Sequence, residues 1–541
     1  MPRLPSLLFL CAVFALVLPL PALAGPLETA IAERMGAPLG AEVTEEESAD
    51  IAALAAFYGA RDYQPLWVSE TGVTARGVTL AEHLLDAGSE GLDPNDYAAR
   101  EIDALLDADT PGALADLETE LNLGLMQFAS DLASGRVEPA LFDPETFVYP
   151  QDVERGQVLT GAAGSADIDA FIESFKPSSD RYDRTRLALE DYRRLAAGGG
   201  WPNVPEGETL KPSTTDPRVQ ALRSRLAVTG EVSGPAAGDP TFFDADLESA
   251  VRAFQARHGL EVDGKVGRES LAALNVPVER RIDQLILNLE RRRWMPDDFG
   301  DRFVFVNLAD FHLKVVVASG GEEDTIFDSR VVVGTPYFRT PVFSDEITYI
   351  EINPYWTVPP SIARNELLPK IKKDPGYLAK NEYLLFDGWG ESAKTLDPQN
   401  IDWTRVRADN FGYKIRQEPG DRNALGRIKF MFPNQFNVYL HDTPSKSLFG
   451  RASRAFSHGC VRVHEPITFA EFVLNGHEGW DEAKVREVID SGKRTVVPLQ
   501  TPLPVHLTYL TAWVNKDGSV HFREDIYGRD ALLAKVLLAD R

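Results

Sequence analysis

Residues 439–466, YLHDTPSKSLFGRASRAFSHGCVRVHEP, are the stretch from which the fold of the C-terminal half can be inferred. His441 ends an apolar run, whereas Cys460 follows a glycine and precedes the alternating residues Val461, Arg462 and Val463. Such alternation is typical of a β-strand. Two strand ends can bring an imidazole and a thiol into contact, which is the geometry that a cysteine–histidine pair requires. The stretch therefore predicts a β-rich domain with Cys460 at a strand end.

Cys460 shares this stretch with three of the nine histidines, His441, His458 and His464. A free thiol has a pKa of about 8.5, so nucleophilic chemistry at neutral pH needs a nearby base or cation. The histidines offer a base and Arg462 a charge, and Gly459 lets backbone N–H groups beside Cys460 face a developing oxyanion. Two other interpretations stay open. Cys460 could be a buried core thiol, or the three histidines and Cys460 could bind zinc.

Residues 1–24 are typical of a secretory signal, with Arg3 before the apolar stretch and a small-residue cleavage site before Gly25. An uncleaved membrane anchor is the alternative, but the span is short and interrupted by prolines. We therefore expect an exported, periplasmic protein that does not span the membrane. Cleavage would remove Cys11 and leave Cys460 without an intramolecular disulfide partner.

The composition fits a folded protein of several domains, since the 541-residue chain is 44% hydrophobic. Its formal net charge of −26 argues against a nucleic-acid binder, because phosphate binding needs a concentrated basic surface. An acidic, solubilising surface is sufficient to explain the charge.

Helical regions are expected between the signal and the β-rich domain. Residues 25–200 carry Ala and Leu at helical spacing and predict a helical scaffold domain. Residues 213–276 include AVRAFQARHGLEVDGKVGRESLAALN, which resembles the small three-helix peptidoglycan-binding module of bacterial wall enzymes, a module that is often only a spacer. Residues 277–301 predict a connecting helix. The arginines at 291–293 are expected to lie in solvent, where they complement the carbonyl end of that helix.

The fold class expected from these patterns is multidomain α+β. Short β-rich runs begin at Phe303 and predict a catalytic domain over residues 302–500, followed by a C-terminal extension over residues 501–541. A polar and aromatic insertion at about residues 369–427 lies between the strands. An insertion of that size near a site is a candidate lid.

The string from His441 through Ser457-His458-Gly459-Cys460-Val461-Arg462 resembles the signature of the L,D-transpeptidases, whose catalytic domain is the β-rich YkuD type. Four further segments resemble the large, multidomain branch of that family: NLERRRWMP at 288–296, INPYWTVPPSIA at 352–363, NALGRIKFMFPN at 423–434 and DIYGRD at 525–530. That branch also carries a helical scaffold domain and a peptidoglycan-binding module. The resemblance therefore covers nearly the whole mature chain.

The resemblance implies a role for each residue of the motif. Cys460 would be the nucleophile and His441 the general acid/base, whereas His458 and Gly459 would shape the loop and the oxyanion hole, and Arg462 would orient groups around the thiolate. Some members lack a histidine at the position of His458, which makes it the weaker candidate for the base. The group that orients His441 stays open between the side chain of Asp442 and a backbone carbonyl. Tyr355, Trp356 and Ser457 are the expected substrate contacts.

The reaction implied by the family is acyl transfer without a metal or other cofactor. Cys460 would attack a tetrapeptide stem of peptidoglycan at the carbonyl of the third residue, release D-alanine and pass the acyl group to an amine. A second stem would give a 3→3 cross-link, and an outer-membrane protein is another possible acceptor. Two alternatives stay open, an L,D-carboxypeptidase-type hydrolase and a wall-binding protein without catalytic activity.

Overall fold

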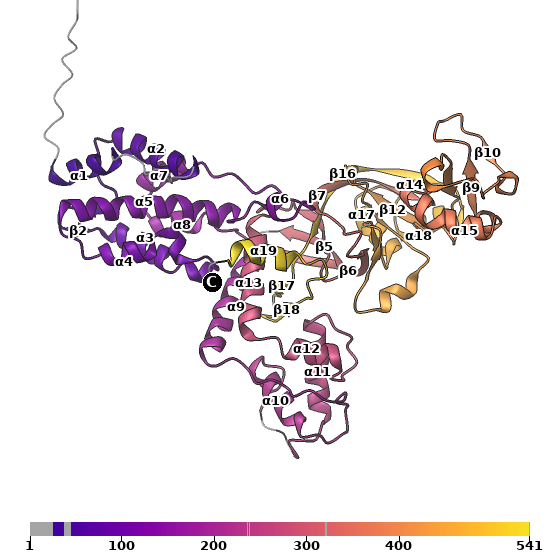
Figure 1. Ribbon diagram of the computed structural model, residues 1–541, viewed down its shortest axis with the longest axis horizontal. Helices are drawn as coiled ribbons and strands as arrows, with labels where there is room; N and C mark the ends of the chain where they lie inside the picture. Colours follow the sequence, from indigo (N-terminus) through magenta and orange to yellow (C-terminus); the bar gives the residue numbers. More distant parts are fainter. Residues whose placement is uncertain (1–24, 37–44, 235, 237, 320–321, 540–541) are drawn as a thin grey trace, which may run out of the picture. The chain divides into compact units, whose positions relative to one another are not determined.

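The computed structural model describes residues 25–36, 45–234, 236, 238–319 and 322–539 (Figure 1). The expected signal segment, with Cys11, lies outside these residues. No described helix combines the length and the apolar character needed to cross a membrane. The chain divides into two compact units: one is formed by residues up to 88 with 93–129 and 153–173, and the other by residues 89–92, 130–152 and 174 onwards.

The first unit is helical and is organised around one long helix. Its elements are α1 (Pro26–Met35), α2 (Glu45–Gly59), β1 (Val68–Ser69), β2 (Gly72–Val73), α3 (Ala75–Leu85), η2 (Pro94–Tyr97), α4 (Ala99–Leu105), α5 (Pro111–Ser134), which runs on into the second unit, α7 (Arg155–Gly164) and α8 (Ile168–Glu173); η1 (Ala87–Glu90) lies at its boundary. Leu117, Leu121 and Leu125 of α5 are fully buried, as their helical spacing predicts. Between them, the buried carboxylate of Glu118 accepts hydrogen bonds from the backbone N–H groups of residues 66–68.

A small helical module with its own core occupies residues 204–274. It contains α10 (Arg218–Val228), α11 (Ala245–Arg257) and α12 (Arg268–Leu274), and its helices bury Leu222, Leu247 and Phe254 against one another. Gly259 follows α11 with a φ of 66°, a left-handed conformation that glycine adopts without steric cost and that ends the helix. The expected three-helix module is confirmed.

The C-terminal half is built on a closed sheet. Its strands follow the order β12-β13-β15-β6-β5-β4-β16-β7, and β12 pairs with β7 to complete the circle; β3 lies beside β7, and β14 pairs with β6. The strands are β3 (Thr146–Phe147), β4 (Arg302–Asn307), β5 (His312–Ser319), β6 (Glu322–Gly334), β7 (Val342–Ile352), β12 (Ile428–Met431), β13 (Leu440–His441), β14 (Ala455–Ser457), β15 (Val461–Val463) and β16 (Thr495–Thr508). The expected multidomain α+β fold with a β-rich C-terminal domain is therefore confirmed.

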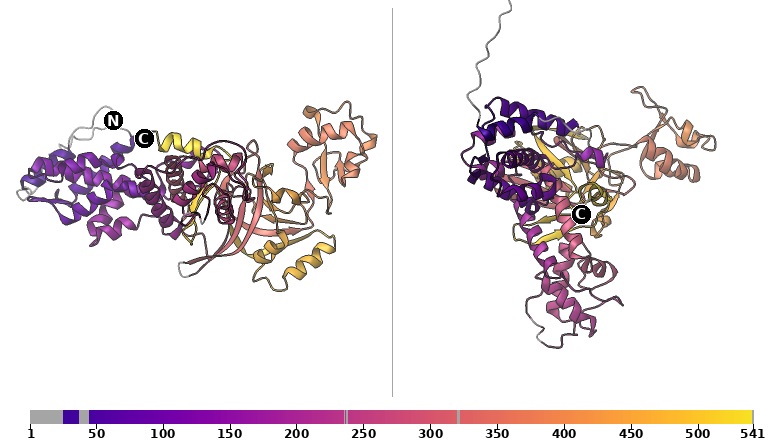
Figure 2. Two further views of the ribbon diagram at one scale, coloured as in Figure 1. Left: turned by 90° about the horizontal axis from the view of Figure 1, so that it is seen from below. Right: turned by 60° about the vertical axis from the view of Figure 1, so that its left-hand side comes forward.

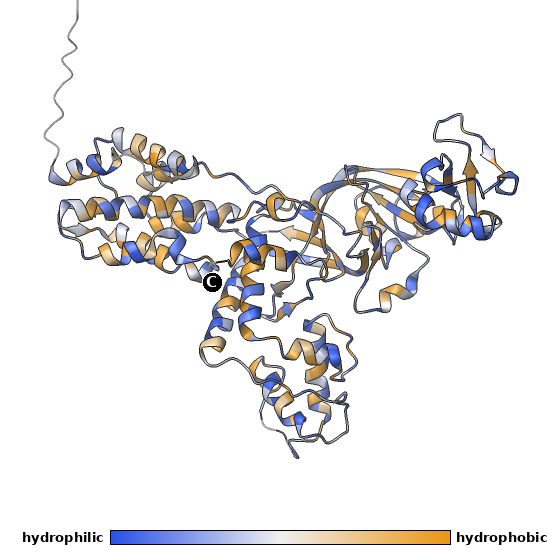
Figure 3. Ribbon diagram, in the orientation of Figure 1, coloured by the Kyte–Doolittle hydropathy of each residue, from blue (hydrophilic) through white to orange (hydrophobic). Residues whose placement is uncertain are grey.

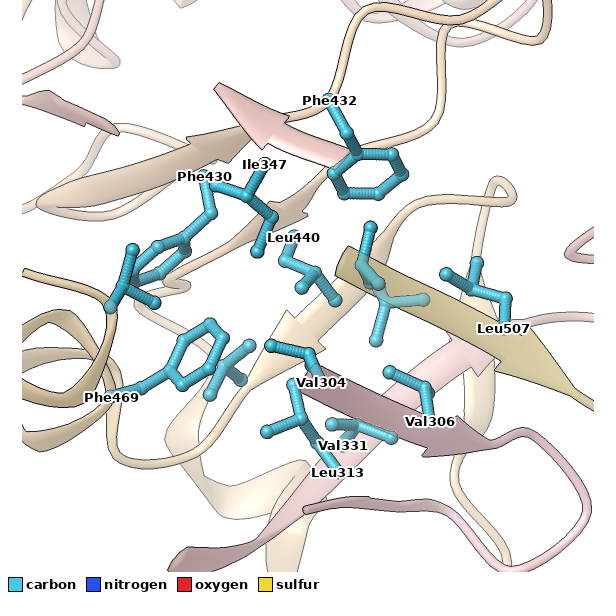
Figure 4. Close-up of a cluster of buried hydrophobic side chains, with 14 of the residues drawn as sticks. Val304, Val306, Leu313, Val331, Ile347, Phe430, Phe432, Leu440, Phe469 and Leu507 are labelled. Atoms are coloured by element: carbon cyan, nitrogen blue, oxygen red, sulfur yellow. The ribbon is translucent and has the colours of Figure 1, made fainter. Parts of the chain in front are cut away.

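The core of this barrel follows from the two-residue period of its strands. Val304 and Val306 of β4 point inwards, and Figure 4 shows them converging with Leu440 and Phe430 and with Phe469 of helix α17 (Pro466–Val473). Helix α18 (Glu482–Asp490) adds further cover. Figure 3 shows the hydrophobic colouring that runs along these strands. Because side chains alternate along a strand, the residues before and after each inward apolar residue point to the outer surface of the barrel.

A separate subdomain is inserted between β7 and β12. It holds a four-stranded sheet in the order β10-β9-β11-β8 and a core of its own, which includes Val358, Leu385 and Ile415. Figure 2 shows its elements gathered together: β8 (Trp356–Thr357), α14 (Pro360–Ile362), the π-helical segment η3 (Ala363–Leu367), α15 (Leu368–Lys373), α16 (Tyr377–Lys380), β9 (Tyr383–Phe386), β10 (Thr395–Leu396), η4 (Pro398–Asn400), η5 (Ala408–Asn410) and β11 (Lys414–Gln417). The insertion thus spans residues 353–427 and starts earlier than the expected residue 369.

One expected domain boundary falls inside an element of the structure, and another differs from the division into two compact units. Strand β16 runs from Thr495 to Thr508 between β4 and β7, so the catalytic sheet continues past residue 500. The remaining elements are η6 (Lys446–Gly450), β17 (Ala512–Val514), β18 (Val520–Phe522) and α19 (Arg529–Leu537). Residues 130–152 and 174–200 cluster with the second unit, which includes α6 (Pro139–Phe142) and α9 (Asp180–Ala197).

The arginine run does not lie in solvent, as was expected. Helix α13 (Val278–Arg293) packs its apolar face on α9, and Arg291, Arg292 and Arg293 are all at least 95% buried. Arg293 pairs with the buried Glu290 at 3.2 Å and donates to the hydroxyl of Tyr182 at 2.8 Å. The expectation failed because the helix end is covered by other segments of the same unit.

We predict that Arg293→Met destabilises α13. The change leaves the carboxylate of Glu290 buried without its cation, which typically costs about 3–5 kcal/mol. Hydrogen exchange of the α13 amides, followed by mass spectrometry, would measure this loss. Arg280→Met is the matched control, because Arg280 lies on the same helix, 75% exposed, and should change the opening free energy by less than about 0.5 kcal/mol. Equal protection in both variants would contradict the prediction.

Candidate active site

Cys460 lies in a tight loop between β14 and β15 that is held by its own hydrogen bonds. The hydroxyl of Ser457 donates to the carbonyl of Cys460 at 2.5 Å and accepts from the N–H of Gly459 at 3.1 Å. Gly459 has a φ of 108°, and its carbonyl accepts from the hydroxyl of Thr340 at 2.8 Å. A side chain at position 459 would have space, so the backbone conformation is what requires glycine.

Three polar side chains form a row on the outer face of the barrel beside this loop. In the parallel pair β13–β15, His441 lies opposite Arg462, and in the antiparallel pair β12–β13, Lys429 lies opposite His441. The neighbours of these residues along the strands, such as Leu440 and Val461, point into the core and are fully buried. Strand alternation therefore places Lys429, His441 and Arg462 side by side near Cys460.

Burial and neighbouring groups shift the pKa of the half-buried Cys460 thiol in opposite directions. Burial raises its pKa above the usual value, whereas hydrogen bonding from Tyr439 and the charges of Lys429 and Arg462 lower it. The net shift is upward. The sulfur also lies 3.7 Å from the carbonyl oxygen of Asn437. At neutral pH the group is therefore mainly a thiol, and it needs a base to become a nucleophile.

His441 is placed as a neutral imidazole. Its Nδ1 lies within hydrogen-bonding distance of the carbonyl oxygen of Asp442, and because a carbonyl only accepts, Nδ1 carries the proton and Nε2 keeps a free lone pair. Burial, and then the charge of Arg462, lower its pKa to about 3. The ring meets that of Tyr439 edge-on at 5.6 Å. A lone pair on Nε2 at neutral pH is what a general base requires.

The carboxylate of Asp442 points away from His441. It accepts hydrogen bonds from the backbone N–H groups of Arg427 at 2.8 Å and Thr443 at 2.7 Å, and it pairs with Lys446 at 2.5 Å. The backbone carbonyl of Asp442, not its side chain, is thus the partner of the imidazole.

His458 is turned outwards, away from the row. Its Nε2 lies 2.6 Å from a carboxylate oxygen of Glu366 in the inserted subdomain, and its ring packs 4.6 Å from that of Phe338. His458 therefore connects the Cys460 loop to the insertion and is not positioned as the base.

The side chain of Arg462 has a buried Nε atom without a hydrogen-bond partner in the described part of the chain. Burial lowers its pKa, and the attraction of Cys460 acts in the opposite direction. This guanidinium is therefore free to bind an additional acceptor near the thiol.

The expected substrate contacts lie in different surroundings. Tyr355 is 36% exposed and packs 4.3 Å from the guanidinium of Arg416, at the start of the insertion. Trp356 packs against the insertion's own core, and the hydroxyl of Ser457 is engaged within the Cys460 loop. Of the three, Tyr355 is the most available to a ligand.

The zinc interpretation receives no support from the arrangement of its ligands. Within the described residues, the only set of three or more candidate ligand atoms within 4.8 Å of one another is His83, Asp169 and Glu173, far from this stretch in the sequence. His458 pairs with Glu366, and His464 packs against Phe449 at 4.9 Å.

Sequence reasoning missed Lys429 and Tyr439. Lys429 lies within the segment NALGRIKFMFPN, where it stands between the apolar residues Ile428 and Phe430. Its ammonium group lies 3.9 Å from the ring centroid of Tyr439. The strand period could have placed Lys429 on the outer face, but its neighbours across the sheet depend on the register of three strands that are distant in sequence.

Comparisons with known proteins match three regions of the chain. Residues 301–495 match the family described as "L,D-transpeptidase catalytic domain", YkuD; residues 215–274 match a "Putative peptidoglycan binding domain"; and residues 52–189 match a "Scaffold domain". A Haemophilus influenzae protein named "Putative L,D-transpeptidase" is 39% identical over 248 residues. The match covers 46% of this chain and 48% of that protein, so the chain spans about half the length of this curated relative.

A solved structure of a fused Zn-dependent amidase/peptidase/peptidoglycan-binding domain-containing protein from Clostridium acetobutylicum is 11% identical. It covers 56% of this chain and 100% of that chain, with a TM-score of 0.16. A score this low does not indicate a shared fold.

We predict that Lys429→Met makes the thiol of Cys460 less reactive at neutral pH. Removing the cation takes away one of the charges that favour the thiolate, so the pKa of the thiol rises further and alkylation at pH 7 slows by about 3- to 10-fold. Iodoacetamide labelling across a pH series, read on the Cys460 peptide by mass spectrometry, measures this shift.

Two variants serve as controls for this measurement. Lys429→Arg keeps the charge and should stay close to the wild-type profile. Lys414→Met removes a lysine that lies over Phe386 at 4.7 Å within the insertion, and it should have no effect on the thiol. An unchanged profile in Lys429→Met would contradict the assignment.

Proposed function

We propose that this chain, which carries the catalytic domain of the YkuD-type L,D-transpeptidases together with a scaffold domain and a peptidoglycan-binding domain, is a cysteine-dependent transpeptidase of the bacterial cell wall. The observation that carries the proposal is the position of Cys460 beside the row Lys429–His441–Arg462. The substrate is a tetrapeptide stem of peptidoglycan. Together with the expected export signal, this substrate favours a location in the periplasm.

In the first half of the reaction, Nε2 of His441 accepts the proton of the Cys460 thiol. The sulfur attacks the carbonyl carbon of the third stem residue, and the amide bond to D-alanine breaks while His441 returns the proton to the departing amine. A thioester and free D-alanine result. The neutral state of His441 at neutral pH supports this role, because an unprotonated imidazole can accept a proton.

The oxyanion needs hydrogen-bond donors that are not already engaged. The N–H of Gly459 donates to Ser457, whereas the N–H of Cys460 has no hydrogen-bond partner among the described residues. We therefore assign the N–H of Cys460 as an oxyanion donor and give Gly459 the role of shaping the loop. The unpartnered Nε of Arg462 is a second candidate. Each such donor typically contributes about 3 kcal/mol to transition-state stabilisation.

In the second half, an acceptor amine loses a proton to His441 and attacks the thioester carbonyl; the C–S bond breaks, and His441 returns the proton to the sulfur of Cys460. A stem amine gives a 3→3 cross-link, an amine of an outer-membrane protein gives a protein attached to the wall, and water gives hydrolysis. The inserted subdomain, with Tyr355 at its start, is positioned to limit the access of water. The contact between His458 and Glu366 supports this role, because it connects the insertion directly to the Cys460 loop.

We predict that Cys460→Ala abolishes the release of D-alanine from tetrapeptide-stem fragments, and that His441→Gln slows it by about 10²–10⁴-fold, the usual contribution of a general acid/base. Mass spectrometry of the products measures both. His464→Ala is the matched control, because it removes a histidine of the same stretch that packs against Phe449, and it should act within about twofold of wild type.

The same assay separates the alternatives. Cross-linked products in the presence of an amine acceptor support a transpeptidase, whereas tripeptide alone indicates the carboxypeptidase-type hydrolase. A protein that releases no D-alanine and forms no covalent adduct with a carbapenem would refute the proposed activity.

We further predict that Glu366→Gln shifts the products towards hydrolysis. Both partners of the His458–Glu366 pair are more than a third exposed, so the effect should be small, below about fivefold in the ratio of hydrolysis to cross-linking. Glu382→Gln, which weakens an ion pair within the insertion at 3.9 Å, is the control and should leave the ratio unchanged. Identical ratios in both variants would argue against a covering role for the insertion.

A further inference from the structure

The three arginines that end α13 differ in whether a carboxylate pairs with them. Arg291 pairs with Asp530 at 2.5 Å and Arg293 pairs with Glu290 at 3.2 Å. Arg292 donates to the hydroxyl of Ser179 at 2.7 Å and approaches the sulfur of Met295 at 3.5 Å, but no carboxylate of the described residues lies within 4.0 Å of it. Its Nε atom is buried without a hydrogen-bond partner, and the side chain is 95% buried. Arg292 is therefore a buried cation that makes no ion pair within 4.0 Å among the described residues, although the charges of Glu323 and Asp297 act on it from farther away.

Arg292 lines a cavity of about 430 Å³ on the outer face of β4 and β5. The start of α9, the loop at residues 297–300, residues 323–325 of β6 and residues 510–516 line its other sides. Phe299, Phe303 and Phe305 form an apolar wall together with Leu510. This volume is within the range that small-molecule sites occupy in proteins.

The other basic residues that line the cavity are already paired with carboxylates. Each remaining basic residue has a carboxylate within 4.0 Å: Arg181 with Glu323, Arg184 with Asp180, His312 and Lys314 with Asp328, and Lys516 with Asp324. Asp310 pairs with Arg523, and Asp297 and Asp298 accept backbone N–H groups. Arg292 is thus the one lining cation that lacks a carboxylate among the described residues.

We propose that this cavity binds a small carboxylate with an apolar or aromatic body, whose carboxylate pairs with Arg292 and whose body lies against Phe299, Phe303 and Phe305. A buried charge is costly unless it is paired, and a planar guanidinium matches a carboxylate in geometry. The pKa of Arg292 agrees: burial and the like charge of Arg181 lower it to about 9, and the charges of Glu323 and Asp297 offset only part of this shift. A bound anion would oppose this downward shift, because a nearby negative charge favours the protonated guanidinium.

The proposed site is independent of the proposed reaction. Cys460 and its row lie on or beside β12, β13 and β15, whereas the cavity is lined by β4, β5 and residues 323–325 at the start of β6, and no residue of the row lines it. Binding at Arg292 therefore does not depend on Cys460 chemistry. A failure of one proposal leaves the other intact.

Calorimetric titration of the full chain would test the site with two probes. N-acetylphenylalanine represents the carboxylate end of a peptide, octanoate represents a fatty acid, and the methyl ester of each lacks the charge. We expect at least one acid to bind and its ester to bind at least tenfold more weakly. Binding of only one acid would identify the source of the ligand, and binding of neither would overturn the proposal.

Variants of the cavity assign the binding to Arg292. Arg292→Met should weaken binding of the acid at least tenfold while leaving D-alanine release unchanged, whereas Lys516→Met, at a paired lining residue, should stay within twofold. Equal binding to Arg292→Met, or equal binding of acid and ester, would overturn the proposal. If Arg292→Met does not fold, Ala318→Trp places a large side chain at the lining of the cavity; lost binding there supports the site, and retained binding overturns it.

Discussion

The parallel pairing of β13 with β15 is the contact on which the candidate site depends. It brings His441 next to Arg462 although the two residues are distant in sequence, and it starts the second strand immediately after Cys460. Leu440 and Val461 fix the register, because both are fully buried and a shift of one residue would expose them. The core therefore determines the arrangement of the candidate catalytic side chains, which occupy strand positions that point away from the core.

The protonation states of Cys460 and His441 follow mainly from their burial. Taking the thiol and the imidazole out of water favours the neutral form of both, so the pKa of Cys460 rises and that of His441 falls. A permanent thiolate–imidazolium pair is thereby disfavoured. In the proposed reaction, Lys429 and Arg462 would provide the positive charge that a transient thiolate needs.

Local patterns allowed the fold class and part of the site to be predicted from the sequence. The helical scaffold, the three-helix module and the β-rich domain are confirmed, as is the resemblance to the L,D-transpeptidases, because each is encoded by short periodic runs or a compact motif. The roles of Cys460 and His441 remain predictions that the geometry supports. Lys429 and the buried arginines could not be found this way. Their surroundings depend on contacts between segments that are distant in sequence, and hydrophobic periodicity predicts only local secondary structure.

The inserted subdomain leaves the barrel after Ile352 and returns at Ile428, and these two residues are paired neighbours on β7 and β12. The pairing of β7 with β12 therefore holds the two ends of the insertion together, whatever segment lies between them. Because the cost of closing a loop grows only slowly with its length, the intervening segment can lengthen, shorten or be replaced with little effect on the sheet. Its separate core adds to this freedom. The insertion can thus diverge among related proteins while the strands that position the candidate site are retained.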